Sequence, residues 1–148
     1  MYSAEFQKHD MYSFKTQIRV RYGETDQMGF VYYGHYAQYY EVGRVETLRS
    51  LGSSYAELEA EGIQMPVMDM EIQYLKPARY DEVITIETRI PELPGARMRF
   101  HYDLTNEEGD LVNIGKTTLV FFDPGTRRPT RPPEWMLNKL RPHYVENP

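Results

Sequence analysis

The sequence predicts an α+β fold in which one long helix packs against a single antiparallel sheet. Residues 14–22, 84–90 and 98–104 alternate apolar and polar side chains with a period of two, which is the pattern of a half-buried strand. Residues 35–51 contain no proline and repeat packing residues at spacings of three and four, which favours a helix. A strand, a long helix and then four consecutive strands give an antiparallel sheet with its helix on one face.

The elements of the first half of the chain have recognisable boundaries. After the first strand, residues 23–34 contain three glycines and mixed polar residues, which indicates a loop. The helix at 35–51 ends at Gly52, a residue that suits a helix C-terminus. Ser53 or Ser54 can then cap a short second helix that runs through Glu61.

The second half of the chain is mostly strand. Residues 63–75 form a weaker strand that Pro66 interrupts. Residues 111–123 form a long strand that pairs with residues 98–104 across a glycine-containing turn. In the C-terminal tail, Pro132 and Pro133 open a short helix that runs through Leu140, since proline is tolerated in a first helical turn.

The long helix is expected to be mostly buried. Its apolar surface is broad, because Tyr39, Val42, Val45 and Leu48 extend it around the helix axis. On the remaining surface, Glu41 can pair with Arg44 and Glu46 with Arg49, since residues three apart lie on the same side of a helix.

Composition bounds the class of protein. Of 148 residues, 41% are hydrophobic and 26% are charged, so we expect residues 1–148 to form one domain, with a core at about 14–123, a short N-terminal extension and a C-terminal helical tail. The net charge of −5 argues against a nucleic-acid partner. Cysteine is absent, which excludes disulfides, thiolate metal ligands and a cysteine nucleophile.

Hydropathy and the single helix indicate the location of the protein and its partners. No apolar run approaches the roughly 20 residues that span a bilayer, and the first ten residues hold no signal-like stretch, so we expect a cytoplasmic protein without a membrane partner. One helix shields a sheet only partly. We therefore expect a second copy to cover the rest, as a homodimer or homotetramer.

The segment that carries chemistry joins the first strand to the long helix. Asp26 stands shortly before the helix N-terminus, where free backbone N–H groups and the helix dipole favour negative charge and can also bind an oxyanion. A fixed carboxylate beside a carbonyl polarised by such amides suits hydrolysis of an activated acyl group. Gly29 and Gly34 allow the backbone to approach a ligand closely.

Structural roles are the commoner explanation of the same residues, and spacing alone does not decide between the two. An aspartate before a glycine is common in turns and caps, and the tyrosines between Tyr32 and Tyr40 suit core or interface packing. His35 is either a base or a capping residue. The four histidines, His9, His35, His101 and His143, show no metal-ligand spacing, so we expect no metal.

The run Tyr22-x-Glu24-Thr25-Asp26-x-x-Gly29-x-Val31-Tyr32-x-x-x-Tyr36, followed by Glu41, resembles the signature of hot-dog-fold acyl-CoA thioesterases of the 4-hydroxybenzoyl-CoA thioesterase type. The resemblance covers about residues 14–123. It implies a hot-dog fold, in which the sheet wraps around the central helix, and an enzyme that hydrolyses acyl-CoA thioesters without a cofactor.

The resemblance also implies roles for particular residues. Asp26 matches the catalytic carboxylate, the backbone N–H of Tyr33 matches the group that polarises the thioester carbonyl, Gly29 matches the active-site glycine, and Glu41 matches an acidic residue near the site. We expect a further set of residues to contact the substrate: Glu24, Tyr32, Gly34, His35, Tyr36, Tyr40, Arg97 and Arg99.

This chain departs from the family pattern at four positions. Relatives commonly read Tyr-His-Ala-Asn-Tyr where this chain reads Tyr32-Tyr33-Gly34-His35-Tyr36. A histidine is therefore replaced by Tyr33 and an asparagine by His35. The backbone role of Tyr33 survives this change, whereas any side-chain role of that histidine does not. Arg97 stands where many relatives have serine.

The leading hypothesis is hydrolysis of an acyl-CoA thioester with Asp26 as nucleophile or as general base for water. The alternatives are a thioesterase that acts on acyl carrier protein and a non-catalytic acyl-CoA-binding module. Because CoA carries phosphates, an acidic chain needs a local basic patch. The candidates are Lys76, Arg79, Arg97, Arg99, Arg127, Arg128 and Arg131.

Overall fold

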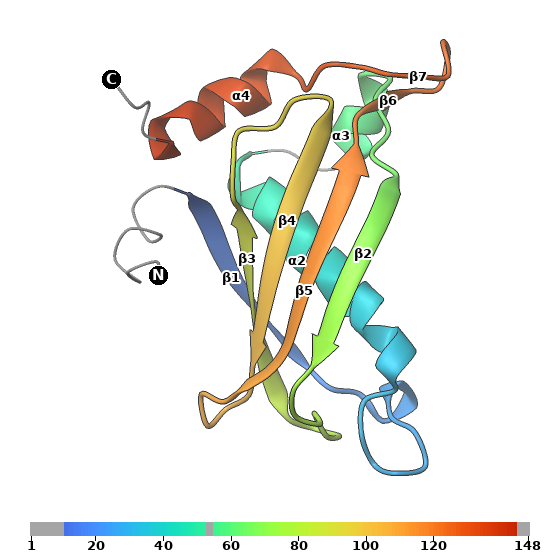
Figure 1. Ribbon diagram of the computed structural model, residues 1–148, viewed down its shortest axis with the longest axis vertical. Coiled ribbons are helices and arrows are strands. Elements are labelled where there is room, and N and C mark those ends of the chain that lie inside the picture. Colours follow the sequence, from blue (N-terminus) through green and yellow to red (C-terminus); the bar gives the residue numbers. More distant parts are fainter. Residues whose placement is uncertain (1–10, 53–54, 145–148) are drawn as a thin grey trace.

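The computed structural model describes residues 11–52 and 55–144, and its centre is a five-stranded antiparallel sheet (Figure 1). The strands are β1 (Tyr12–Arg19), β2 (Val67–Tyr74), β3 (Val83–Ile90), β4 (Arg97–Thr105) and β5 (Leu111–Val120), in the order β1-β3-β4-β5-β2. β2 pairs with β5, so it lies at the edge opposite β1. The predicted α+β class is confirmed.

Two neighbouring inner strands, β3 and β4, supply much of the core. Along β3 and β4 every second side chain is buried, as expected for strands with one face against a helix. The buried aliphatic and aromatic side chains of these strands are Ile84, Ile86, Ile90, Met98, Phe100, Tyr102 and Leu104.

The long helix α2 (Tyr36–Ser50) crosses the other side of this core, behind the sheet in Figure 1. Two glycines permit its close approach. A Cβ on Gly43 would lie 2.5 Å from Oγ1 of Thr88 in β3, and a Cβ on Gly115 of β5 would overlap the ring of Tyr40. Gly52 follows the helix and its capping residue Leu51, and its φ of +93° is left-handed, so the predicted C-terminal glycine is confirmed.

The expectation that α2 is mostly buried is confirmed on the face that packs against the sheet. One face is buried, but Glu41 is exposed and Val42 is 37% exposed. Glu46 does pair with Arg49. The expected Glu41–Arg44 pair does not form, because Arg44 turns inward and donates to the hydroxyls of Tyr55 (3.3 Å) and Tyr102 (3.2 Å).

Three predicted strands differ in their limits. The first ends at Arg19 rather than residue 22, and Tyr22 lies in the 3₁₀ turn η1 (Tyr22–Glu24), where it is 77% exposed. β2 begins only after Pro66, since proline removes a donor from the ladder. The segment at 111–123 is divided into β5, which belongs to the five-stranded sheet, and β6 (Phe122–Asp123), which belongs to a separate two-stranded sheet.

Short elements close the end of the sheet away from the start of α2. They are α3 (Tyr55–Ala60), β7 (Arg128–Pro129), which pairs with β6, α4 (Glu134–Leu140) and η3 (Arg141–His143). The predicted tail helix is confirmed in α4, which buries Met136 and Leu140. The predicted caps Ser53 and Ser54 lie outside the described residues. No helix within residues 11–52 and 55–144 is long and apolar enough to cross a membrane.

Candidate active site

The loop between β1 and α2 is a small hairpin with Asp26 at its tip. Its stem is closed by the N–H of Tyr32, which donates to the carbonyl of Glu24 (2.9 Å), and by the N–H of Asp26, which donates to the carbonyl of Phe30 (2.8 Å). Gly29 has a φ of +81°, which favours glycine at the turn. The hairpin holds the Asp26 backbone in a defined place.

The carboxylate of Asp26 is anchored by one of its two oxygens. Oδ1 accepts hydrogen bonds from the N–H groups of Met28 (2.9 Å) and Phe30 (3.4 Å). Among the described residues both hydrogen bonds fall on this oxygen, and the side chain is only half-buried. The turn role and the catalytic role that the sequence left open are thus compatible, because Oδ2 is available for a substrate or a water.

Glu24 has a different environment from Asp26. Its carboxylate is 7% exposed and accepts hydrogen bonds from the N–H of Arg21 (2.8 Å) and the hydroxyl of Tyr39 (2.9 Å). The other oxygen lies 3.0 Å from an Arg21 guanidinium nitrogen and 3.1 Å from Nε2 of His35. Burial alone would raise the pKa of Glu24, but these hydrogen bonds and the His35 charge outweigh it and lower the pKa.

The helical segment begins at η2 (Tyr33–His35), which continues directly into α2. The N–H of Tyr33 stands at the start of this segment, where no preceding turn supplies an acceptor. The carbonyl of Tyr33 accepts a hydrogen bond from the hydroxyl of Tyr74 in β2 (3.0 Å). The first peptide groups of the segment are therefore held in a fixed orientation.

The four tyrosines expected near the substrate divide into two pairs. Tyr32 and Tyr33 are 48% and 64% exposed, and their ring centroids lie 4.6 Å apart. Tyr36 and Tyr40 are buried. Tyr40 stacks on Tyr102 and bonds to Asn113, so it is a core residue with no exposed face for a substrate. The Tyr32 ring packs against Gly34, where a Cβ would lie 2.7 Å from the ring.

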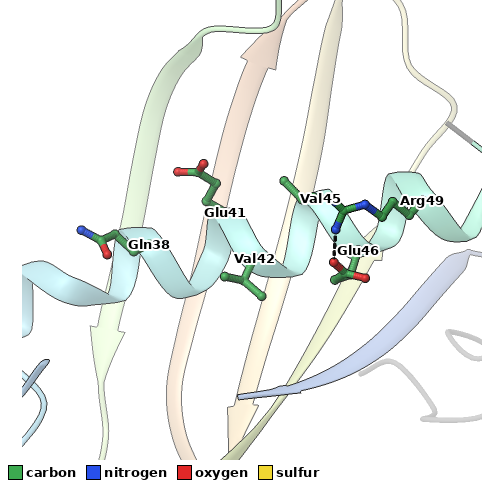
Figure 2. Close-up of a pocket in the computed structure, with 6 residues that line it drawn as sticks. All are labelled: Gln38, Glu41, Val42, Val45, Glu46 and Arg49. Carbon is green, nitrogen blue, oxygen red and sulfur yellow. Dashed lines mark hydrogen bonds and ion pairs between the residues drawn. The ribbon is translucent and has the colours of Figure 1, made fainter. Parts of the chain in front are cut away.

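Glu41 lies one helical turn along α2, on its outward face, rather than in the hairpin. This face borders a hollow of about 400 Å³, and Figure 2 shows its lining side chains projecting from successive turns of α2. A smaller hollow of about 230 Å³ lies between β1 and the start of α2, with Glu24, His35 and Tyr39 in its wall. The side chains that line the 400 Å³ hollow on α2 are Gln38, Glu41, Val42, Val45, Glu46 and Arg49.

Arg97 and Arg99 lie far along the sheet from Asp26 in the same chain. Arg97 pairs in register with Val120, at the end of β4 opposite to the hairpin, and Arg99 forms an ion pair with Glu92 (2.7 Å). Arg79 is closer. Its backbone bridges Phe30 of the hairpin, and its guanidinium lies 4.8 Å from the centroid of the Phe30 ring.

Lys76 is a weaker candidate for phosphate binding. It pairs with Asp110 (3.0 Å) in a hollow that also contains Glu82, Glu107 and Glu108.

In the described ranges 11–52 and 55–144, no three histidine, aspartate or glutamate side chains converge on a point that could hold a metal ion.

The sequence reasoning did not single out three residues that position this site. In the sequence, Tyr39 fits helix packing, Arg21 fits the polar side of a strand, and Tyr74 lies in the weak strand at 63–75. The spacing of Arg21 and Glu24 is a local signal, because side chains three residues apart meet in a turn. The contacts of Tyr39 and Tyr74 join segments 15 and 41 residues apart and leave no such signal.

The chain matches known proteins over most of its length. Residues 20–140 match the model of the Thioesterase-like superfamily. The chain is 34% identical to the acyl-CoA thioester hydrolase YbgC of Escherichia coli over 128 residues, covering 86% of this chain and 96% of that protein. Among solved structures it is similar to the DHNA-CoA thioesterase of Staphylococcus aureus, with 37% identity, a TM-score of 0.77 and 80% of both chains covered.

A second structure, the hypothetical protein TT1821 of Thermus thermophilus, is 35% identical with a TM-score of 0.82, and the match covers 91% of this chain and all of that one. The chain therefore belongs to the Thioesterase-like superfamily. The hot-dog fold and the thioesterase class of enzyme that the sequence resemblance implied are confirmed at this level.

Proposed function

We propose that this chain hydrolyses acyl-CoA thioesters to the free acid and CoA, with Asp26 as the catalytic carboxylate and the backbone N–H of Tyr33 polarising the thioester carbonyl. The observation that carries the proposal is the hairpin: it fixes Oδ1 of Asp26 and leads within a few residues to the start of a helical segment. Relatives named as acyl-CoA thioesterases support the substrate class.

The chemistry needs few groups. The thioester carbonyl would accept a hydrogen bond from the Tyr33 N–H, which stabilises the negative charge that develops on oxygen. Oδ2 of Asp26 would either attack the carbonyl carbon, forming a mixed anhydride that water then hydrolyses, or remove a proton from an attacking water. The CoA thiolate leaves in both routes. Because a thiolate is a good leaving group, no strong general acid is required.

The same proposal assigns a second copy of the chain to the exposed edge of the sheet. Met68, Met70 and Tyr74 of β2 are 49%, 42% and 51% exposed, and among residues 11–52 and 55–144 β2 pairs with β5 on one side only. Such an edge is unfavourable in water. A homodimer in which two β2 strands meet would cover it, and would bring a second chain near the Tyr74–Tyr33 contact. A tetramer built from two such dimers stays a prediction.

Two finer expectations also remain predictions. They are membership of the 4-hydroxybenzoyl-CoA type and a cytoplasmic location. The CoA phosphates would meet a basic side chain, and Arg79 beside the hairpin is the strongest candidate, since it is tied to Phe30.

The test is a thiol-release assay with the purified protein over aromatic, short-chain and long-chain acyl-CoAs, with matching acyl groups on acyl carrier protein. We expect thiol release from at least one acyl-CoA class above the uncatalysed rate. Release only from acyl carrier protein would favour that substrate instead. Thermal stabilisation by acyl-CoA without any thiol release would indicate a binding module and overturn the proposal.

A further inference from the structure

The Glu24 carboxylate connects three segments around the catalytic hairpin. It accepts hydrogen bonds from Arg21 in the turn before the hairpin and from Tyr39 in the second turn of α2, and it contacts His35 in η2. Its backbone carbonyl also closes the hairpin stem by accepting from the Tyr32 N–H. One residue therefore joins the stem of the Asp26 hairpin to the start of the helix at both main chain and side chain.

His35 is the second half of this connection. Its Nε2 lies 3.1 Å from Oε2 of Glu24, its ring packs edge-on against Tyr39 with centroids 5.1 Å apart, and its N–H donates to the carbonyl of Tyr32 (2.9 Å). The imidazole is 17% exposed. The short distance between the ring nitrogen and the carboxylate oxygen places His35 and Glu24 in direct contact at the start of the helical segment.

These contacts leave Glu24 little capacity for a substrate. Burial raises the pKa of Tyr39 strongly, as does its hydrogen bond to Glu24, so the hydroxyl stays protonated and donates. Arg21 and Tyr39 donate hydrogen bonds to the Glu24 carboxylate and His35 contacts it, so this carboxylate is satisfied inside the protein.

We propose that Glu24 and His35 form a positioning pair that fixes the Asp26 hairpin relative to the Tyr33 N–H, rather than contacting the substrate. The pair rests on the proposed thioesterase function, because its purpose is to set the distance between the carboxylate and the group that polarises the carbonyl. Misplacement of a catalytic group by about 1 Å can lower a rate about a hundredfold, so loosening this connection should reduce kcat while leaving substrate affinity nearly intact.

The test compares kcat and KM of four variants on the acyl-CoA that the wild type cleaves fastest. Glu24→Gln keeps the side-chain volume but directs an amide N–H toward groups that are themselves donors. His35→Leu removes the polar ring that contacts Glu24, whereas His35→Gln keeps a polar side chain with an N–H at a similar reach. The fourth variant combines Glu24→Gln with His35→Leu. Glu134→Gln is the control, because it disrupts a comparable ion pair with Arg141 (3.1 Å) on the distant helix α4.

We expect Glu24→Gln and His35→Leu each to lower kcat about tenfold or more, with KM changed by less than about threefold. The kcat of the double variant should be no lower than that of the less active single variant, because both changes break the same connection. His35→Gln should keep kcat within about threefold of wild type. Additive losses, a change confined to KM, or equal losses in His35→Gln and His35→Leu would overturn the positioning pair.

A readout independent of activity separates this inference from the proposed function. Hydrogen exchange of the Met28 and Phe30 amides reports how firmly the hairpin holds Asp26. We expect Glu24→Gln to speed this exchange while Glu134→Gln does not, even if the assay shows no thioester hydrolysis. Unchanged exchange in Glu24→Gln would overturn the pair. A wild type without thiol release would instead overturn the proposed function alone.

Discussion

At the residue scale, two carboxylates two positions apart have been given different surroundings. Glu24 is buried with donors on both oxygens, whereas Asp26 is half-buried and its two hydrogen bonds within the described residues fall on Oδ1. A carboxylate that is satisfied inside the protein can hold a loop in place. One with an oxygen to spare can take part in a reaction.

The surroundings of Glu24 make a prediction about acid stability. Its pKa is lowered in the folded protein, so its ionised form contributes stability above its ordinary pKa, and this contribution is lost as the pH falls through the folded value. Arg21, Tyr39 and His35 contact the carboxylate, and Arg19 lines the same hollow. Between about pH 6 and pH 3, we expect the melting temperature of Glu24→Gln to fall less than that of wild type.

Thermal melts followed by circular dichroism across this range measure the difference. Glu134→Gln, which changes an exposed carboxylate, should follow the wild-type curve. Parallel curves for wild type and Glu24→Gln would show that the Glu24 carboxylate does not titrate in this way.

At the element scale, the contact between α2 and the sheet depends on small residues. Gly43 faces Thr88 and Ile86 of β3, and a Cβ there would lie 2.5 Å and 2.9 Å from their side-chain atoms. The helix would have to move away from the sheet, and since α2 continues from η2, that movement would reach the Tyr33 end.

We expect Gly43→Ala to lower the free energy of unfolding by about 1–3 kcal/mol, the usual effect of overpacking a core. Gly95→Ala is the matched control, because a Cβ at Gly95 meets nothing within 4 Å. Urea denaturation of both variants measures the difference. If Gly43→Ala is as stable as Gly95→Ala, α2 does not pack as closely as the structure indicates.

The sequence predicted the elements better than their contacts. The period of two in β3 and β4 and the glycine at the end of α2 are local signals, so those elements were expected at nearly their observed limits. The fate of Arg44 was not, because an inward turn toward Tyr55 and Tyr102 depends on residues 11 and 58 positions away. The pairing of β2 with β5 rather than with a sequence neighbour is likewise set by tertiary packing.

In the candidate site, too, the sequence predicted the local features and did not predict the long-range contacts. The motif around Asp26 identified the loop and the approach to the helix, since both are contiguous in sequence. It gave no means to distinguish a substrate contact from an internal one. Tyr40 therefore stood among the expected substrate residues, although its ring is stacked on Tyr102 inside the core.

At the scale of the whole molecule, the exposed edge strand is the feature that one chain leaves incomplete. Met70 lies on the helix side of the sheet, opposite Thr117 of β5, and is 42% exposed. Gln73 lies on the other face of the same strand. A second copy pairing along β2 would cover Met70, because side chains on the same face of two paired strands contact each other.

We expect the wild-type protein to have the mass of a dimer or tetramer by light scattering coupled to size exclusion. Met70→Lys should shift the mass toward that of the monomer, because the dimer would bury an unpaired charge. Gln73→Lys should leave the mass unchanged. A wild-type monomer at all concentrations would contradict the proposed dimer.

The central claim concerns Asp26, and the most direct measurement is the rate of thiol release by Asp26→Asn. The amide keeps the size of the side chain and an oxygen to accept from Met28, so the variant should melt close to wild type. Because it can neither attack the thioester nor remove a proton from water, we expect kcat/KM to fall about a hundredfold or more. A folded Asp26→Asn protein that hydrolyses acyl-CoA at a rate near that of wild type would contradict the account.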